Sequence, residues 1–232
     1  MLTKHPAHEC QEPLQVDESD SEHPGFFDPL GALRVTRHHL PHWHQDHVYA
    51  FVTWRLADAL PQVTVDRIRF DRKLWFEAHP QPWSIDTARE YRVLFSNRID
   101  KLLDSGAGDC ILKQPAASKL VAGALAHFDG TRYDLEAFVV MPNHVHTLIR
   151  LGNADQLSKV VHSWKSYSAK QLFGFARDPG RIWQAGYWDR LVREPNHLAF
   201  YRRYIAANPE NTRLGAGQFD LWLKPRVPLD CW

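Results

Sequence analysis

The stretch YDLEAFVVMPNHVHTLIRL, residues 133–151, decides how the rest of the chain is interpreted. It contains two runs rich in apolar and β-branched residues, 133–140 and 144–151, and such runs favour β-strands. Between them stands Met-Pro-Asn, residues 141–143, in which Pro and Asn supply turn chemistry. The stretch therefore predicts two adjacent strands joined by a tight turn.

Strand and helix signals alternate on both sides of this pair. Before it, the sequence predicts a strand over 47–56 and helices over 63–78, over 84–104 and from Pro115; after it come a helix over 155–173, a strand over 187–192 and a helix over 196–207 that is halted by Pro209. This order predicts an α+β fold with a ferredoxin-like (RRM-like) antiparallel sheet, packed by helices on one face.

The length of 232 residues fits one domain with tails or insertions. Residues 1–32 are polar and lack periodicity, which predicts a disordered tail. The domain is expected over 33–215, followed by a C-terminal tail over 216–232. The helical segment 63–104 is long for this fold and is interpreted as an insertion.

The composition is that of an ordinary globular protein, with 44% hydrophobic and 24% charged residues. The three cysteines are far apart and show neither zinc-finger spacing nor a disulfide framework. A reducing cytoplasm is the expected location, and no apolar stretch approaches the length of a membrane span.

The formal net charge is only +1, but the charge is unevenly distributed. Residues 156–207 carry nine Lys or Arg against three Asp or Glu. A basic segment of this kind is typical of a phosphate-binding face, although a solvated helix face explains it as well.

His144 and His146 stand in an otherwise apolar strand. Side chains two apart on a strand share one face, so both imidazoles are expected side by side, within reach of one divalent ion. Two histidines on a half-exposed sheet are the simpler alternative. A second group, His42, His44 and His47, lies in a polar lead-in, where we expect a surface role.

Tyr204 and Asn208 are four residues apart in the last predicted helix, and this spacing places them on one face. If that face covers the histidine strand, Asn208 could supply an oxygen ligand while Tyr204 presents its hydroxyl nearby. The alternative is an ordinary amphipathic helix with a core Tyr and a terminal Asn-Pro.

Several blocks stand together in one characteristic order. They are FVVMPNHVH at 138–146, SWKSY at 163–167, Trp183-Gln184, WDR at 188–190 and YIAANP at 204–209. In this order they resemble the REP-associated tyrosine transposases, a bacterial branch of the single-tyrosine HUH transposases. The likeness spans about residues 33–214.

The resemblance implies a role for each matching position. His144 and His146 match the metal-binding histidines, Asn208 the third ligand, and Tyr204 the nucleophile. The implied cofactor is Mg²⁺ or Mn²⁺, and the implied partner is single-stranded or hairpin DNA. The implied reaction is cleavage and strand transfer at hairpin-forming repeats through a 5′-phosphotyrosine, in a cytoplasmic, nucleoid-associated bacterial protein.

Basic and aromatic residues around these blocks are candidates for DNA contacts. The phosphate-binding candidates are Lys165, Lys170, Arg190, Arg193, Arg202 and Arg203, and the base-stacking candidates are Trp183 and Trp188. Stacking of an unpaired base is worth about 1–3 kcal/mol.

Other functions stay open at this point. A domesticated hairpin-binding protein would keep the DNA contacts without cutting, and a relaxase or replication-initiator nickase would use the same chemistry on another site. A water-using metal hydrolase would leave Tyr204 structural. The sequence decides neither the hairpin recognised nor whether the protein is a monomer or a homodimer.

Overall fold

The computed structural model describes residues 25–37, 41–80, 83–152, 156–177 and 180–225. Most of the N-terminal tail expected over 1–32 lies outside these ranges. Within them, no helix combines the length and the hydropathy needed to cross a membrane.

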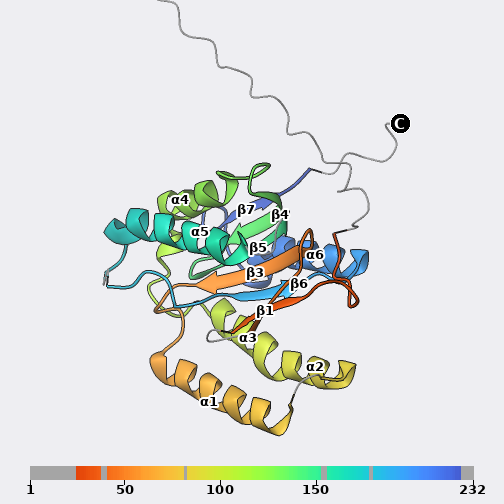
Figure 1. Ribbon diagram of the computed structural model, residues 1–232. Helices are drawn as coiled ribbons and strands as arrows, with labels where there is room; N and C mark the ends of the chain where they lie inside the picture. Colours follow the sequence, from red (N-terminus) through yellow and green to blue (C-terminus); the bar gives the residue numbers. More distant parts are fainter. Residues whose placement is uncertain (1–24, 38–40, 81–82, 153–155, 178–179, 226–232) are drawn as a thin grey trace, which may run out of the picture.

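Five antiparallel strands form the central sheet, in the spatial order β6-β3-β5-β4-β7 (Figure 1). They are β3 (Tyr49–Arg55), β4 (Tyr133–Val140), β5 (His144–Leu151), β6 (Trp188–Leu191) and β7 (Asp220–Leu223). Counted along the chain, the first four of these strands lie in the order 4-1-3-2, with a helical crossover after the first and after the third. This is the ferredoxin-like plan, so the predicted α+β fold is confirmed.

The predicted pair of strands around residues 141–143 is β4 and β5. Their register places Val140 opposite Val145 and Val139 opposite His146. The Met141 N–H donates to the His144 carbonyl at 2.8 Å and closes the turn. Strand β5 also pairs with β3, so its backbone is hydrogen-bonded on both sides. Strand β5 is thus the middle strand of the five, and β3 and β4 both hold its register.

Helices α4 (Pro115–Ala126) and α5 (Gln156–Leu172) cover one face of the sheet. At the centre of this core lies Trp164, which is 2% exposed. Its ring stacks on Trp54, and its Nε1 donates to the Tyr133 hydroxyl at 2.9 Å. The hydroxyl partner removes the cost of burying the indole N–H.

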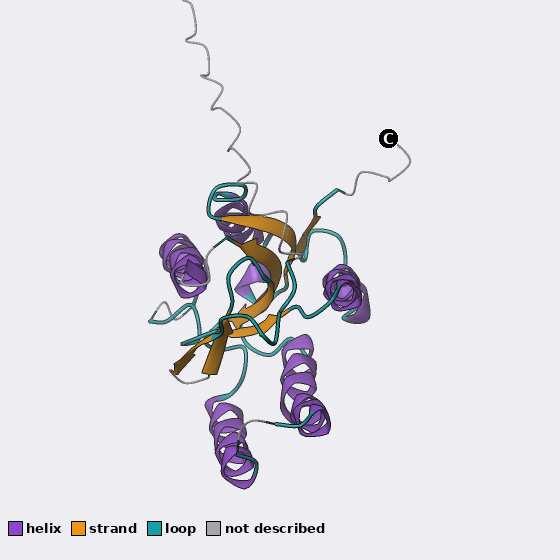
Figure 2. Cartoon of the chain, turned by 45° about the vertical axis from the view of Figure 1, so that its right-hand side comes forward, coloured by secondary structure: helices purple, strands orange, loops and turns teal. Residues whose placement is uncertain are grey.

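Helix α6 (Pro195–Asn211) covers the opposite face, where Tyr201 and Ile205 pack on strand residues (Figure 2). The expectation that helices cover one face only is therefore wrong. The expected stop at Pro209 is also wrong, because α6 continues for two more residues. Proline removes one N–H, and one missing hydrogen bond near a helix end is tolerated when the ring is buried, as here.

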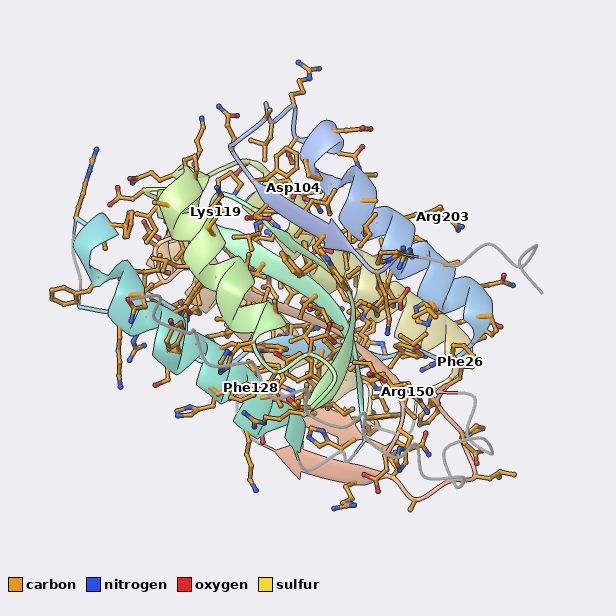
Figure 3. The ribbon with its side chains drawn as sticks, turned by 90° about the horizontal axis from the view of Figure 1, so that it is seen from above. Phe26, Asp104, Lys119, Phe128, Arg150 and Arg203 are labelled. Atoms are coloured by element: carbon orange, nitrogen blue, oxygen red, sulfur yellow. The ribbon has the colours of Figure 1, made fainter. Side chains whose placement is uncertain are left out.

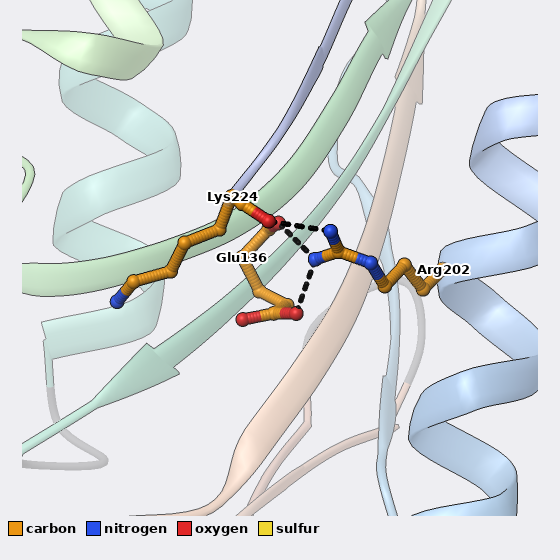
Figure 4. A network of polar contacts seen from close by, with 3 residues as sticks. All are labelled: Glu136, Arg202 and Lys224. Atoms are coloured by element: carbon orange, nitrogen blue, oxygen red, sulfur yellow. Dashed lines mark hydrogen bonds and ion pairs between the residues drawn. The ribbon is translucent and has the colours of Figure 1, made fainter. Parts of the chain in front are cut away.

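Arg202 ties α6 to the sheet (Figure 4). Its guanidinium donates to the carboxylate and the carbonyl of Glu136 on β4, and to the Lys224 carbonyl just after β7. Both partners of the ion pair are largely buried, with side chains 16% and 12% exposed. Strand β7 therefore belongs to the sheet, and the described sheet extends beyond the domain boundary expected at residue 215.

The segment interpreted as an insertion forms a helical unit between β3 and α4. It comprises α1 (Gln62–Ala78), α2 (Ile85–Tyr91), the π-helical turn η2 (Arg92–Ser96) and α3 (Asn97–Asp104). These helices stand away from α4 and α5, at the other end of the molecule (Figures 1 and 2). A small separate sheet of β1 (Arg34–Arg37) and β2 (Pro41–His44) precedes β3.

Replacing Trp164 by Ala is expected to lower the free energy of unfolding by about 3–5 kcal/mol, because the change opens a cavity in the core. Urea denaturation measures the effect. Tyr167→Ala is the matched control on the same helix, since Tyr167 is 53% exposed, and we expect a change within about 0.5 kcal/mol. Equal effects of the two substitutions would contradict the described core.

Candidate metal and nucleophile site

The two histidines of β5 face α6. His144 and His146 are 1% and 0% exposed, and their Nε2 atoms are 3.0 Å apart. They lie opposite Arg55 and Thr53 of β3 in the sheet register. Val145, between them, points into the core on the other face. Strand alternation thus places both imidazoles together, as the sequence indicates.

Neighbouring side chains hold both rings by their Nδ1 atoms. His144 Nδ1 lies 2.8 Å from the Asn143 amide oxygen, and His146 Nδ1 lies 2.7 Å from the Thr53 hydroxyl. The Asn143 amide nitrogen donates to two backbone carbonyls, so its oxygen must be the atom that faces His144. His144 Nδ1 then carries the proton, which leaves its Nε2 lone pair directed at the site.

Burial keeps these rings neutral. It lowers the pKa of His144 to about 3, and burial together with His144 lowers the pKa of His146 well below its usual range. Neutral imidazole is the form that binds a metal ion. Because the two Nε2 atoms face one another, a cation or a proton must lie between them to prevent repulsion of two lone pairs.

Helix α6 brings Tyr204 and Asn208 over the histidines. The rings of Tyr204 and His146 have centroids 5.2 Å apart, and Asn208 is 2% exposed. The Tyr204 hydroxyl and the Asn208 amide oxygen are both buried, and neither makes a regular hydrogen bond with the described residues. Buried polar atoms without partners are uncommon and call for a ligand or an ion.

Two acidic residues of the helical insertion also reach this site, and neither was predicted from the sequence. Asp100 and Asp104 of α3 lie near the Tyr204 hydroxyl. Burial, and then Asp104, raise the pKa of Asp100 to about 6, and burial raises the pKa of Asp104 to about 6. Burial and these two carboxylates raise the pKa of Tyr204 far above its ordinary value. In the sequence, the i, i+4 spacing of Asp100 and Asp104 was the only feature that could have indicated a shared role.

The residues present fit a divalent ion. Among the described residues, no three His, Cys, Asp or Glu side chains form a metal-binding cluster, and the donors that could hold an ion here are the two imidazoles and the Asn208 amide oxygen. Two neighbouring ligands of an octahedral ion with bonds of about 2.1 Å stand about 3.0 Å apart. The separation of the Nε2 atoms, 3.0 Å, has this value.

Among the predicted phosphate-binding residues, three are exposed at the surface: Lys170, Arg193 and Arg203. Figure 3 shows Arg203 on the outer side of α6. Arg202, by contrast, is bound to Glu136, and Lys165 Nζ donates to the carbonyls of Gln184 and Gly186. These two cations already stabilise the fold.

The two predicted stacking residues differ in their surroundings. Trp183 is 5% exposed and donates to the Ser168 hydroxyl at 3.0 Å, so a base could stack on it only if the core opened. Trp188 is half-buried beside Phe51, and the Arg190 guanidinium lies 4.2 Å from its ring centroid. Trp188 and Arg190 thus form one cationic and aromatic surface next to the site.

The surface role expected for His42 and His44 is wrong. Both are buried, at 5% and 6% exposed. His42 Nδ1 bonds to the Asp189 carboxylate, and its ring stacks on Tyr187 with centroids 4.3 Å apart. The reason is tertiary, because β2 packs against β6 and encloses these side chains.

Residues 112–208 match the model of the family described as "Transposase IS200 like". The matched region includes both histidines, Tyr204 and Asn208. It excludes β3 and the helical insertion. The resemblance drawn from the motifs is confirmed at the level of this family.

Two of the solved structures that the chain resembles overlap with it only in part. A REP-associated tyrosine transposase bound to a REP hairpin has 14% identity and a TM-score of 0.43, over 75% of this chain and 74% of the other. A crystal structure described as that of a transposase from Deinococcus radiodurans R1 has 16% identity and a TM-score of 0.28, over 72% of this chain and 92% of the other. A search of the curated proteins found no significant match.

Addition of Mn²⁺ is expected to raise the melting temperature, because an ion that binds only the folded state stabilises it. In Asn208→Ala the concentration of Mn²⁺ that gives half of this shift should rise at least tenfold. Asn211→Ala, at the exposed end of the same helix, is the control and should respond like the unmodified protein. A normal response of Asn208→Ala would exclude the amide as a ligand.

Asp100→Asn is expected to stabilise the protein at pH 7.5 by about 1–3 kcal/mol. The folded pKa of Asp100 is raised to about 6, so its carboxyl favours folding below the unfolded value near 4 and loses that contribution as pH rises through 6. Unfolding at pH 7.5 and pH 4 measures the difference, and the gain should nearly vanish at pH 4. A gain of equal size at both values would contradict this assignment.

Proposed function

We propose that this protein is a metal-dependent endonuclease and strand transferase for single-stranded DNA. Its substrates are hairpin-forming repeats, and it acts through a covalent 5′-phosphotyrosine at Tyr204. Family membership over residues 112–208 supports a DNA-processing role. The motif resemblance supports the REP-associated branch, and with it a bacterial cytoplasmic, nucleoid-associated location.

The observation that carries the proposal is the convergence of four polar atoms, two of them without hydrogen-bond partners among the described residues, at one buried point. Two imidazole Nε2 atoms face one another at 3.0 Å, and the Asn208 oxygen and the Tyr204 hydroxyl lie buried beside them without regular hydrogen bonds. Burying such groups unsatisfied costs about 1–3 kcal/mol each, which a structural role would not require. A metal ion and a substrate phosphate would satisfy them.

The proposed reaction is an in-line displacement at phosphorus. The Tyr204 oxygen attacks the scissile phosphate, the bond from phosphorus to the 3′ oxygen breaks, and the released 3′ oxygen takes up a proton. The phosphodiester energy is kept in the phosphotyrosine, so a later 3′-hydroxyl can reverse the step and join strands. When bound to His144, His146 and Asn208, a Mg²⁺ or Mn²⁺ ion polarises the phosphoryl oxygen.

The neutral phenol needs a proton acceptor, because burial and nearby carboxylates hold its pKa far above neutrality. Asp100 lies beside the hydroxyl and, with a pKa of about 6, is mostly ionised at pH 7.5. We propose that Asp100 accepts the proton of the Tyr204 phenol. In the proposed reaction, the role of Asn143 and Thr53 is to fix the orientation of the two imidazoles.

For the DNA itself, the exposed Lys170, Arg193 and Arg203 are proposed as phosphate contacts, and Trp188 with Arg190 as a stacking surface. Lys165, Arg202 and Trp183 are proposed as further DNA contacts, although each already has a partner in the fold. Whether one protomer or two bind a hairpin follows from none of these contacts.

The test is a covalent-adduct assay with labelled single-stranded hairpin DNA, taken from repeats near the gene, and Mn²⁺ or Mg²⁺. We expect a labelled protein band that requires metal and is lost in Tyr204→Phe. Tyr201→Phe is the control, because Tyr201 lies one turn earlier on α6 and packs on Phe51 in the core. It should still form the adduct.

Two results would contradict the proposal in different ways. Binding of several authentic hairpins without any adduct, with either metal, would favour a domesticated binding protein. Cleavage that survives Tyr204→Phe would favour a water-using hydrolase.

A further inference from the structure

A cavity of about 170 Å³ lies between the helical insertion and the sheet. Its walls come from α1 and α3 on one side, and from the end of β3 and the loop 184–188 on the other. Most of this lining lies outside the region that matches the transposase family. The cavity therefore belongs to the part of the chain for which the motifs predict no role.

Three arginines line the cavity, namely Arg55, Arg69 and Arg72. Asp100 is the acidic residue of the lining, so the wall has an excess of positive charge. Burial, and then Arg69, lower the pKa of Arg55 to about 10, which shows that its positive charge is poorly compensated. Such a wall favours an anion.

Polar atoms in this wall also lack partners. Arg55 Nη1, Arg72 Nε and the Tyr187 hydroxyl are buried, and none of them has a hydrogen-bond partner among the described residues. Three lining residues with unused polar atoms indicate that the cavity takes a ligand with acceptor oxygens. A phosphate group provides such oxygens and the required charge.

The rest of the lining is apolar. Leu60, Val65, Ile68, Ile99 and Leu103 contribute to the cavity, and Trp188 stands at its edge. An inorganic anion would gain nothing from these side chains. A nucleotide has both an anionic phosphate and a flat base, and so it matches a cavity with both kinds of wall.

The cavity lies next to the nucleophile site and shares two neighbouring residues with it. Thr53 lines it and also bonds to His146 Nδ1 at 2.7 Å. Asp100 lines it and lies beside the Tyr204 hydroxyl. A strand whose phosphate is presented to Tyr204 would therefore pass the mouth of the cavity.

We propose that this cavity binds one unpaired nucleotide of the substrate strand next to the scissile phosphate, with its phosphate on Arg55, Arg69 and Arg72 and its base against the apolar wall. The helical insertion is thus a part of the substrate site. The inference rests on the proposed function for the identity of the strand.

The test measures DNA binding in the Tyr204→Phe background, where no cleavage interferes. Fluorescence anisotropy compares a blunt hairpin with hairpins that carry a four-nucleotide unpaired flank on either side. Arg69→Gln with Arg72→Gln should weaken binding of one flanked hairpin at least tenfold and leave the blunt hairpin unchanged. The slope of log Kd against log salt for that DNA should fall by up to about 0.7, since one phosphate contact on a single strand contributes about 0.7.

The matched control is Arg67→Gln, on the same helix but outside the cavity lining, with a side chain 70% exposed. The single variant Arg69→Gln is also tested, because its side chain is 57% exposed and its replacement should not disturb the fold. The melting temperature of each variant shows whether it folds. Removal of one base from the unpaired flank, which leaves an abasic position, should weaken DNA binding by about tenfold. A free deoxynucleoside monophosphate should compete only at far higher concentration than the flanked hairpin.

The outcomes separate this inference from the proposed function. An adduct with the unmodified protein, combined with unchanged binding by the arginine variants, would overturn the cavity assignment and leave the nuclease intact. Equal losses on blunt and flanked hairpins would also overturn it, since they indicate a general phosphate contact. A loss confined to the flanked hairpin would support the cavity even if no adduct ever formed.

Discussion

The pairing of β5 with strands on both of its sides is the constraint on which the site depends. Because β3 and β4 both hold its register, the strand cannot slip by one residue without moving every side chain to the other face. Such a slip would send His144 and His146 into the core of α4 and α5 and bring Val145 to the site. The two imidazoles are therefore placed by the backbone of the sheet before any ligand binds.

The polar groups buried at the site destabilise the folded state, and packing in the two cores offsets this destabilisation. Two buried imidazoles, an unpartnered amide oxygen, an unpartnered phenol and two acids of raised pKa lie between the sheet and the helices. Burial of polar and ionisable groups of this kind costs free energy. Packing on both faces, with Trp164 on one and Tyr201 on the other, supplies the stability that allows this arrangement.

The helical insertion changes what the ferredoxin-like sheet can do. On its own, the sheet with α6 presents two histidines, Asn208 and Tyr204. Helix α3 adds carboxylates beside the nucleophile, and α1 adds arginines on a cavity that begins there. Tyr204, the proposed nucleophile, thus lies near the carboxylate of Asp100, which also lines a cavity with a cationic wall.

By itself, the sequence determined the strands around residues 141–143, the shared face of His144 and His146, and the i, i+4 pair on the last helix. These features depend on local periodicity, which neighbouring residues encode directly. Tertiary structure alone decided that α6 covers the opposite face, that β7 completes the sheet, and that His42 is buried against Asp189. It also decided that Asp100 reaches the site and that Arg69 lines the neighbouring cavity, because contacts between segments far apart in the chain depend on packing, which no local pattern records.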